Sequence, residues 1–419
     1  MKRGSRLLGI FILLAVLMQD IAGAASVRVV DASSRRPIEG ARVTIAGRVE
    51  VTDANGMANL QGTGGPIAVR APGYRRLQQA VIDASAGTVE VALAPFHARA
   101  LYLSFYGIGD ARLRGAALSL LAETDLNALV IDVKGDRGGI PYRSGIALAA
   151  ETGAQQVITV RDLPALVALL RAQGIYLVAR VVSFKDDLLA RRRPELAVHT
   201  HSGGLFIDRE GLAWTDPFRP EVRAYVLEVA EEVARMGFDE IQFDYVRFPD
   251  QAGLVFAEPN TEANRVSAIT GFLAEAGRRL APYNVFIAAD VFGYVLWNRD
   301  DTDIGQRLED LVQHVDYLSP MLYPSSFQFG IPRYTDPVAH PYEIVRLSLD
   351  NALRRTGLSP LRFRPWLQAF RDYAFDRRDF EAGEIAAQIR AAEAFGTAGW
   401  MLWNPRNAYS EAGLRRGGN

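Results

Sequence analysis

The stretch from Gly237 to Pro249, GFDEIQFDYVRFP, predicts a buried β-strand over residues 240–246 with charged residues near its carboxyl end. The segment before it carries Val or Tyr at i, i+3, i+4 and i+7 from Val222 onward, which is the period of an amphipathic helix. Pro220 suits the first turn of that helix, where no backbone N–H is needed. The sequence here predicts a helix followed by a buried strand, the repeating unit of α/β folds.

The same alternation of short apolar strands and amphipathic segments continues to the end of the chain. The predicted strands cover residues 100–106, 128–134, 176–183, 240–246, 285–291, 317–323, 365–370 and 399–403. Eight strand–helix units over about 320 residues are typical of a TIM-type (β/α)₈ barrel with loop insertions. A doubly wound open sheet is the alternative, but no glycine-rich phosphate loop follows the first strand. We therefore expect an α/β fold with a TIM barrel over residues 97–419.

The start of the chain reads as a secretory signal peptide over residues 1–25. Basic residues precede an apolar run over residues 7–18, and small residues allow cleavage after Ala24. The run is shorter than the roughly 20 residues that a membrane-spanning helix needs, and an uncleaved anchor is the alternative. We expect a periplasmic or secreted protein with no integral membrane segment after removal of the signal.

Composition limits the classes of partner and site. Hydrophobic residues make up 49% of the chain and charged residues 23%, which is ordinary for a globular protein. The formal net charge of −1 gives no bulk attraction for nucleic acid, so none is expected as a partner. The chain has no Cys, which excludes disulfides and thiolate metal sites. No cofactor is implied.

Polar residues within the predicted strands indicate which side of each strand faces the barrel interior. Alternate side chains of a strand point to opposite faces, and a charge buried against the helices would cost several kcal/mol. In the fourth strand Ile241 and Phe243 then face the helices, and Gln242 and Asp244 face inward. The same argument turns these residues inward: Asp132, Lys134, Arg180, Asp290, Ser319, Tyr323 and Gln368. Most lie near the carboxyl ends of their strands, where TIM-barrel enzymes have their active sites.

The barrel segments of the sequence resemble a bacterial family catalogued as glycoside hydrolases with α-amylase-like barrels. The fourth-strand signature is residues 237–249, and further matching segments are residues 130–134, 179–186, 214–217, 289–293 and 316–325. The match covers nearly the whole barrel. Two positions depart from the pattern: Gly135 stands where an acidic residue is expected, and Ser326 where a His is expected.

Residues 26–95 contain short strands separated by turns and show no helical period, which predicts a small all-β sandwich. The segments 30–43, 52–56 and 71–74 resemble the carboxypeptidase-regulatory-like domain. That resemblance implies an accessory module with no chemistry of its own.

Glycoside hydrolysis needs two carboxyl groups that flank the scissile bond. The resemblance places the nucleophile at Asp244 and the acid/base at Asp290, on neighbouring strands. Asp132 is a reserve carboxylate, interpreted as a hydrogen-bonding partner held by Lys134. The structural alternative for Asp244 is an ion pair with Arg247 or Lys134. We expect a hydrolase of poly- or oligosaccharides.

Further residues are candidates for contacts with the sugar. They are Lys134, Arg180, Lys185, Tyr106, Gln242, Arg247, Tyr323, Gln368 and Trp403. The aromatic members could stack on sugar rings, although such residues are as often part of the core. His199 and His201 lie in a polar loop without an evident third ligand, so no metal site is expected.

Two other classes of function compete with the hydrolase. One is a non-catalytic barrel that binds envelope polysaccharide. The other is a carbohydrate deacetylase, which would need a metal triad that the five His do not obviously supply. An active hydrolase should present Asp244 and Asp290 across an open cleft, whereas a binding barrel would have a plugged mouth or one lined by aromatic residues alone.

Overall fold

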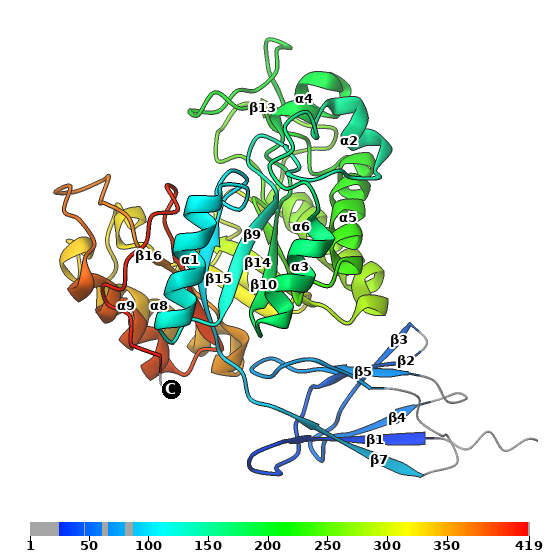
Figure 1. Cartoon of the computed structure of the whole chain (residues 1–419). Helices are drawn as coiled ribbons and strands as arrows, with labels where there is room; N and C mark the ends of the chain where they lie inside the picture. Colours follow the sequence, from blue (N-terminus) through cyan, green and yellow to red (C-terminus); the bar gives the residue numbers. More distant parts are fainter. Residues whose placement is uncertain (1–24, 46, 61–65, 80–86, 418–419) are drawn as a thin grey trace, which may run out of the picture.

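The computed structural model describes residues 25–45, 47–60, 66–79 and 87–417 (Figure 1). The predicted signal peptide lies almost entirely outside these residues. Within them, no helix is both long enough and apolar enough to cross a membrane.

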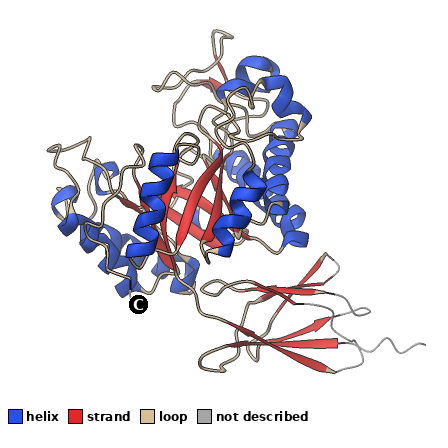
Figure 2. Ribbon diagram, viewed as in Figure 1, coloured by secondary structure: helices blue, strands red, loops and turns tan. Residues whose placement is uncertain are grey.

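Two small sheets form the N-terminal part (Figure 2). One has the order β4-β1-β7 and the other β3-β2-β5-β6. Their bounds are β1 (Ala25–Asp31), β2 (Arg42–Ile45), β3 (Arg48–Val51), β4 (Met57–Leu60), β5 (Ile67–Arg70), β6 (Leu77–Gln79) and β7 (Thr88–Leu93). Val27 and Val29 of the first sheet share one buried cluster with Val43 and Ile45 of the second. The two sheets therefore pack around a common apolar core.

A closed parallel barrel follows, which confirms the predicted fold class. Its eight strands are β8 (Ala98–Leu103), β9 (Ala128–Lys134), β10 (Tyr176–Val182), β12 (Glu240–Asp244), β14 (Phe286–Phe292), β15 (Tyr317–Met321), β16 (Trp366–Gln368) and β17 (Gly399–Trp403). The order is sequential, and β17 pairs with β8 to close the ring. Several strands end earlier than predicted, because apolar residues continue into the loops after β8, β12 and β15.

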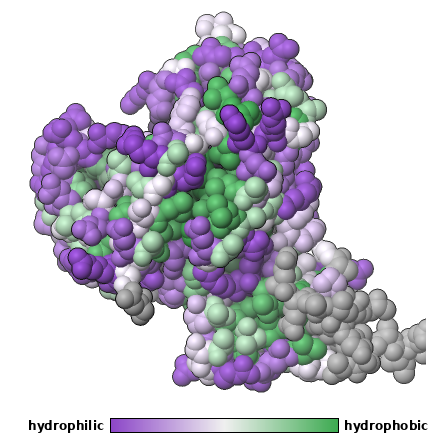
Figure 3. Space-filling model, viewed as in Figure 1, coloured by the Kyte–Doolittle hydropathy of each residue, from purple (hydrophilic) through white to green (hydrophobic). Residues whose placement is uncertain are grey.

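Helices surround the barrel and bury their apolar faces against it (Figures 1 and 2). They are α1 (Ala111–Glu123), α2 (Ala147–Thr152), α3 (Leu163–Ala172), α4 (Asp187–Arg192), α5 (Pro220–Arg235), α6 (Glu262–Leu280), α7 (Leu308–Leu311), α8 (Pro341–Thr356) and α9 (Ala382–Phe395). The predicted helix before β12 is α5, which starts at Pro220. A short two-stranded antiparallel sheet of β11 (His199–Thr200) and β13 (Leu254–Val255) lies in the loops beyond the barrel's carboxyl end. Hydrophilic residues cover most of the visible surface, with apolar patches over the barrel (Figure 3).

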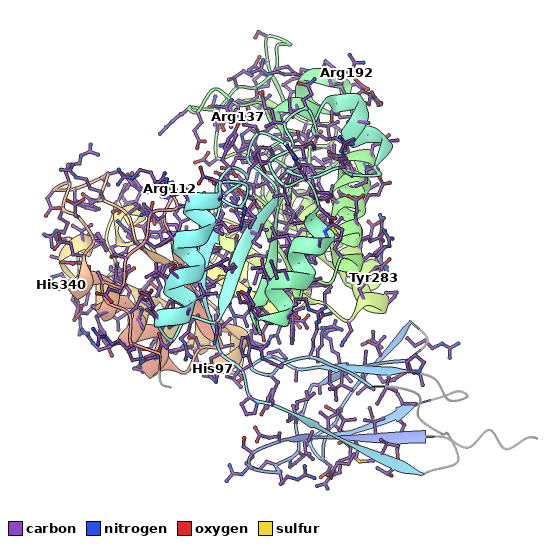
Figure 4. All side chains as sticks on the ribbon, viewed as in Figure 1. His97, Arg112, Arg137, Arg192, Tyr283 and His340 are labelled. Atoms are coloured by element: carbon purple, nitrogen blue, oxygen red, sulfur yellow. The ribbon has the colours of Figure 1, made fainter. Side chains whose placement is uncertain are left out.

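The β part docks on the amino-terminal end of the barrel. Arg70 of β5 is buried and pairs with Asp316, just before β15, at 3.3 Å. Arg76 pairs with Asp239, just before β12, and also donates to the carbonyl oxygen of Tyr283, labelled at this end of the barrel in Figure 4. All these barrel residues precede their strands. The opposite, carboxyl-terminal end of the barrel is therefore left clear of the β part.

Candidate active site

A cavity of about 160 Å³ lies at the carboxyl-terminal end of the barrel. Its lining residues come from six strands or the loops that follow them: Arg180, Asp244, Tyr245, Arg247, Phe292, Met321, Tyr323, Trp366 and Trp403. Five of these were predicted as site residues, namely Asp244, Arg180, Arg247, Tyr323 and Trp403. A TIM-barrel enzyme has its site at this end, so the cavity is the candidate active site.

Arg180 of β10 lines this cavity and donates hydrogen bonds to three carboxylates. Its guanidinium donates to Asp244 at 2.5 and 2.9 Å, to Asp132 at 2.7 Å and to Asp136 at 3.1 Å. Burial opposes the charge of Arg180, but these carboxylates outweigh it and raise the pKa of the guanidinium further above its usual range. Arg180 therefore stays charged and fixes the orientation of Asp244.

Asp244 ends β12 and lies in the cavity wall. One carboxylate oxygen receives both bonds from Arg180, and the other accepts from the backbone N–H of Tyr245 at 2.6 Å. Neither Arg247 nor Lys134 pairs with Asp244 within the described residues, so the structural alternative for Asp244 named the wrong partners. These bonds hold the Asp244 carboxylate in one orientation at the cavity wall.

Asp132 of β9 is held by Arg180 and by other groups, not by Lys134 as the sequence suggested. It accepts from the Tyr102 hydroxyl at 2.6 Å and from the Phe105 N–H at 3.2 Å. Burial raises the pKa of Asp132 to about 6, against the opposing effect of Arg180. Asp132 therefore lies in the cluster below the cavity as a second carboxyl partner of Arg180.

Asp290 of β14 is adjacent to Asp244 across the strand pair. Phe243 pairs with Ala289, and the next step of this register brings Asp244 level with Asp290. One carboxyl oxygen of Asp290 accepts from Trp366 Nε1 at 2.8 Å, and the other is buried without a partner. Burial, and secondly the charge of Asp244, raises the pKa of Asp290 well above its ordinary value. Asp290 therefore keeps its proton to a higher pH than an ordinary carboxyl group does.

The expected open cleft between the two carboxyl groups is not present. Only 1% of Asp290 is exposed, and it is not among the residues that line the cavity. The mouth is narrowed by the aromatic rings of Tyr323, Trp366 and Trp403, yet it is not lined by aromatics alone, because Asp244 and Arg180 also line it.

The placement of Lys134 at the mouth is wrong. Its ammonium is fully buried, pairs with Asp186 at 2.8 Å and donates to the carbonyl of Val182 at 2.8 Å. It also lies over the ring of Tyr225 in α5. A bulge shifts the register between β9 and β10 at this point, so that Val181 pairs with Lys134 instead of Val133. The bulge breaks the alternation on which the prediction rested and turns Lys134 towards the helices.

Three further predicted contacts lie outside the cavity. Gln242 is buried inside the barrel and donates to Ser319, and Gln368 donates to Ser325 and to the Phe370 carbonyl, bracing the loop after β15. Tyr106 is 65% exposed in the loop after β8. None of the three lines the cavity.

Lys185 lines a neighbouring cavity of about 240 Å³. Its ammonium pairs with Asp208 at 3.1 Å and Glu210 at 2.9 Å, and not with Asp186. Tyr245 and Arg247 line both cavities. These two residues therefore form the partition between them.

Sequence reasoning missed two residues of the site, Trp366 in the cavity lining and Asp136 beside Arg180. Trp366 stands two positions before Gln368, so strand alternation could have identified it as inward-facing. Asp136 lies one position beyond Gly135, where an acidic residue was expected, and its carboxylate reaches Arg180. Asp136, two positions after Lys134, thus supplies the acidic contact that was expected at residue 135.

The described residues contain no group of three or more His, Cys, Asp or Glu arranged to hold a metal ion.

Comparisons with known proteins identify a family for this chain and a solved structure with a similar fold. A sequence model of the family described as "Putative glycosyl hydrolase domain" matches residues 100–409. A hypothetical protein from Ruminiclostridium thermocellum is 35% identical, with a TM-score of 0.41, over 46% of this chain and 97% of its own. The PgaB (BpsB) glycoside hydrolase domain from Bordetella bronchiseptica is 14% identical, with a TM-score of 0.52, over 75% of this chain and 95% of its own. This last likeness shows the barrel fold. No curated protein matches the chain.

Proposed function

Because the chain belongs to the family described as "Putative glycosyl hydrolase domain", we propose that it hydrolyses glycosidic bonds of a poly- or oligosaccharide with Asp244 and Asp290. The family implies a carbohydrate substrate. The observation that carries the proposal is a pair of carboxyl groups, level on adjacent strands, of which Asp244 is held by Arg180 in the cavity wall and Asp290 is buried with a raised pKa. Such a pair is what acid-assisted glycoside cleavage uses.

The roles follow from these surroundings. Asp244, which accepts hydrogen bonds from Arg180, is the nucleophile or base at the cavity wall. Asp290, protonated, donates its proton to the leaving-group oxygen as the C1–O bond breaks. As a nucleophile, Asp244 bonds to C1 as the leaving group departs, and water then displaces Asp244 from C1 and gives its proton back to Asp290. As a base, Asp244 instead takes the proton of a water molecule that attacks C1 directly. Because Asp290 is only 1% exposed, the residues that cover it have to move before the sugar can reach it.

The aromatic wall suits a sugar ring. The ring of Trp403 stacks on that of Tyr102, with 3.9 Å between the ring centres, which holds Trp403 in place. Tyr323 follows β15, two strands away from β17, and lines the same cavity. Flat aromatic faces bury the apolar C–H faces of sugars while the hydroxyl groups stay available for hydrogen bonds.

The direct test is to incubate the purified mature chain with a panel of bacterial and plant polysaccharides. New reducing ends from at least one polysaccharide are expected. A panel that yields none, with the chain folded and soluble, would count against hydrolysis.

The rival is a non-catalytic polysaccharide-binding barrel, and the observation that favours it is the 1% exposure of Asp290. Its signature would be glycan binding by the wild-type chain that releases no reducing ends and is insensitive to Asp290.

We expect Asp290→Asn to change how stability depends on pH. A carboxyl group whose pKa is raised on folding binds its proton more tightly in the folded chain. Its contribution to stability is therefore complete below the unfolded pKa, about 3.9, and is lost as pH rises towards the folded value. Asn cannot release a proton, so the melting temperature of the variant should gain on that of the wild type as pH rises. Thermal unfolding from pH 4 to pH 9 measures this.

The same variant should lose more activity on substrates with poor leaving groups. The nitrophenolate of a nitrophenyl glycoside leaves without taking a proton, whereas a sugar leaving group needs a proton on its oxygen. Melting curves that run parallel across the pH range, with equal loss on both substrate types, would contradict the assigned role of Asp290.

Export is also a proposal. The predicted signal would deliver the chain to the periplasm or the medium. Mass spectrometry of the protein purified from its host should find Ala25 at the N-terminus, and a retained Met1 in a membrane fraction would favour the uncleaved anchor.

A further inference from the structure

Arg247 follows β12 in the partition between the two cavities and is 7% exposed. Its guanidinium lies 4.5 Å from the ring centre of Phe292, 4.8 Å from that of Trp214 and 5.2 Å from that of Tyr245. The hydrogen bond found for it among the described residues goes from Nη1 to the carbonyl of Phe248. The remaining N–H groups are not sealed in the interior, because none of its nitrogens is among the buried atoms without a partner.

Arg247 differs from the other buried cations of the described chain. Each of those has a carboxylate within 4.0 Å: Arg70, Lys134, Arg180, Lys185, Arg265 and Arg364. Arg247 has none within that distance in the described residues. Burial lowers its pKa, and the charges of Asp250, Asp244 and Asp208 oppose this only from farther away. A buried charge with no carboxylate in contact is costly, and the three rings offset only part of that cost.

The shape of the Arg247 guanidinium determines the side from which an anion can bind it. Aromatic rings contact the faces of a guanidinium, whereas its N–H bonds point outward in its own plane. Two cavities meet at this residue, one of them lined by Asp244. A planar anion entering from a cavity can therefore take two parallel N–H bonds.

We propose that Arg247 receives a carboxylate of the substrate, which makes the substrate an acidic glycan built from uronic-acid residues. The inference rests on the proposed function for the identity of the ligand as a glycan. Arg suits this role better than Lys because its fork matches a carboxylate with two bonds.

Matched ligand pairs test the assignment. Oligogalacturonate, oligomannuronate and oligoglucuronate are each compared with the same oligomer after reduction of its carboxyl groups to alcohols. Calorimetric titration of the Asp244→Asn chain, which prevents turnover, gives the dissociation constants. At least one acidic oligomer should bind about tenfold or more tightly than its reduced partner, the usual size of a charge-assisted bond. If no acidic oligomer binds more tightly than its reduced partner, the assignment is overturned.

Variants locate the effect. Arg247→Gln should abolish the preference for the acidic member of the pair, and Arg247→Lys should retain part of it. Arg209→Gln is the matched control, because Arg209 is an exposed arginine on the rim of the second cavity. A loss of preference in Arg209→Gln equal to that in Arg247→Gln would indicate general charge attraction and would overturn the inference.

The result is separable from the proposed function. Acid-selective binding that depends on Arg247, without new reducing ends from any polysaccharide, would leave the binding site standing and remove the hydrolase. Cleavage of neutral polysaccharides alone would keep the hydrolase and remove the acidic substrate.

Discussion

Lys134→Met should destabilise the barrel by about 3–5 kcal/mol, the cost of removing one partner of a buried ion pair. The substitution leaves the Asp186 carboxylate buried with only its capping bond, to the N–H of Leu189 at the start of α4. The carbonyl of Val182 loses its donor as well. A melting temperature lower by roughly 5–10 °C is expected for a barrel of this size.

Asp186 is only 1% exposed, so solvent does not relieve that cost where the carboxylate lies. Gly138 packs so closely that a Cβ at its position would lie 2.0 Å from Asp186 Oδ1. Removing both charges, in Lys134→Met with Asp186→Asn, should therefore recover much of the lost stability, since Asn keeps the capping oxygen.

Lys185→Met is the matched control for this pair. Lys185 is equally buried, but its partner Glu210 is exposed and Asp208 is partly so. Water can solvate these two carboxylates once the lysine is gone, so a smaller loss of stability is expected. Equal losses in both single variants, with no recovery in the double variant, would contradict a buried pair at Lys134.

Strand alternation predicted much of the barrel from sequence, because a helix-facing charge is costly in every strand. It placed Asp244, Arg180 and Asp290 inward, and the structure has all three on the interior face. It failed at Lys134, where a bulge that no local signal marks in the sequence reverses the alternation.

The arrangement of partners could not be read from sequence for a different reason. Arg180 reaches carboxylates on β9, on β12 and in the loop after β9, and its choice depends on the stagger of the strands. The alternation of side chains along a strand predicts which face each one is on. It does not predict how far along the barrel axis each one lies relative to the side chains of the neighbouring strands. Asp290 was therefore expected in an open cleft, and it lies covered beside Trp366.

Asp244→Asn should lower the rate of glycoside hydrolysis by about 10³-fold or more, equivalent to about 4 kcal/mol in the barrier. The substitution keeps the shape of the side chain and removes the charge that attacks or stabilises the anomeric carbon. The fold should survive, because Arg180 keeps its bonds to Asp132 and Asp136. Initial rates of reducing-end release on a cleaved polysaccharide measure the effect.

Asp136→Asn is the control that separates catalysis from simple loss of charge near Arg180. It removes another carboxylate from the same guanidinium, but Asp136 is partly exposed and outside the cavity lining. A loss below about tenfold is expected there, in the range of a partly exposed ion pair. Sugar affinity should persist in Asp244→Asn, since stacking rests on Trp403 and Tyr323. If Asp244→Asn cleaves as fast as the wild type, or if both variants lose activity equally, Asp244 is a structural partner of Arg180 and the barrel is a binding module.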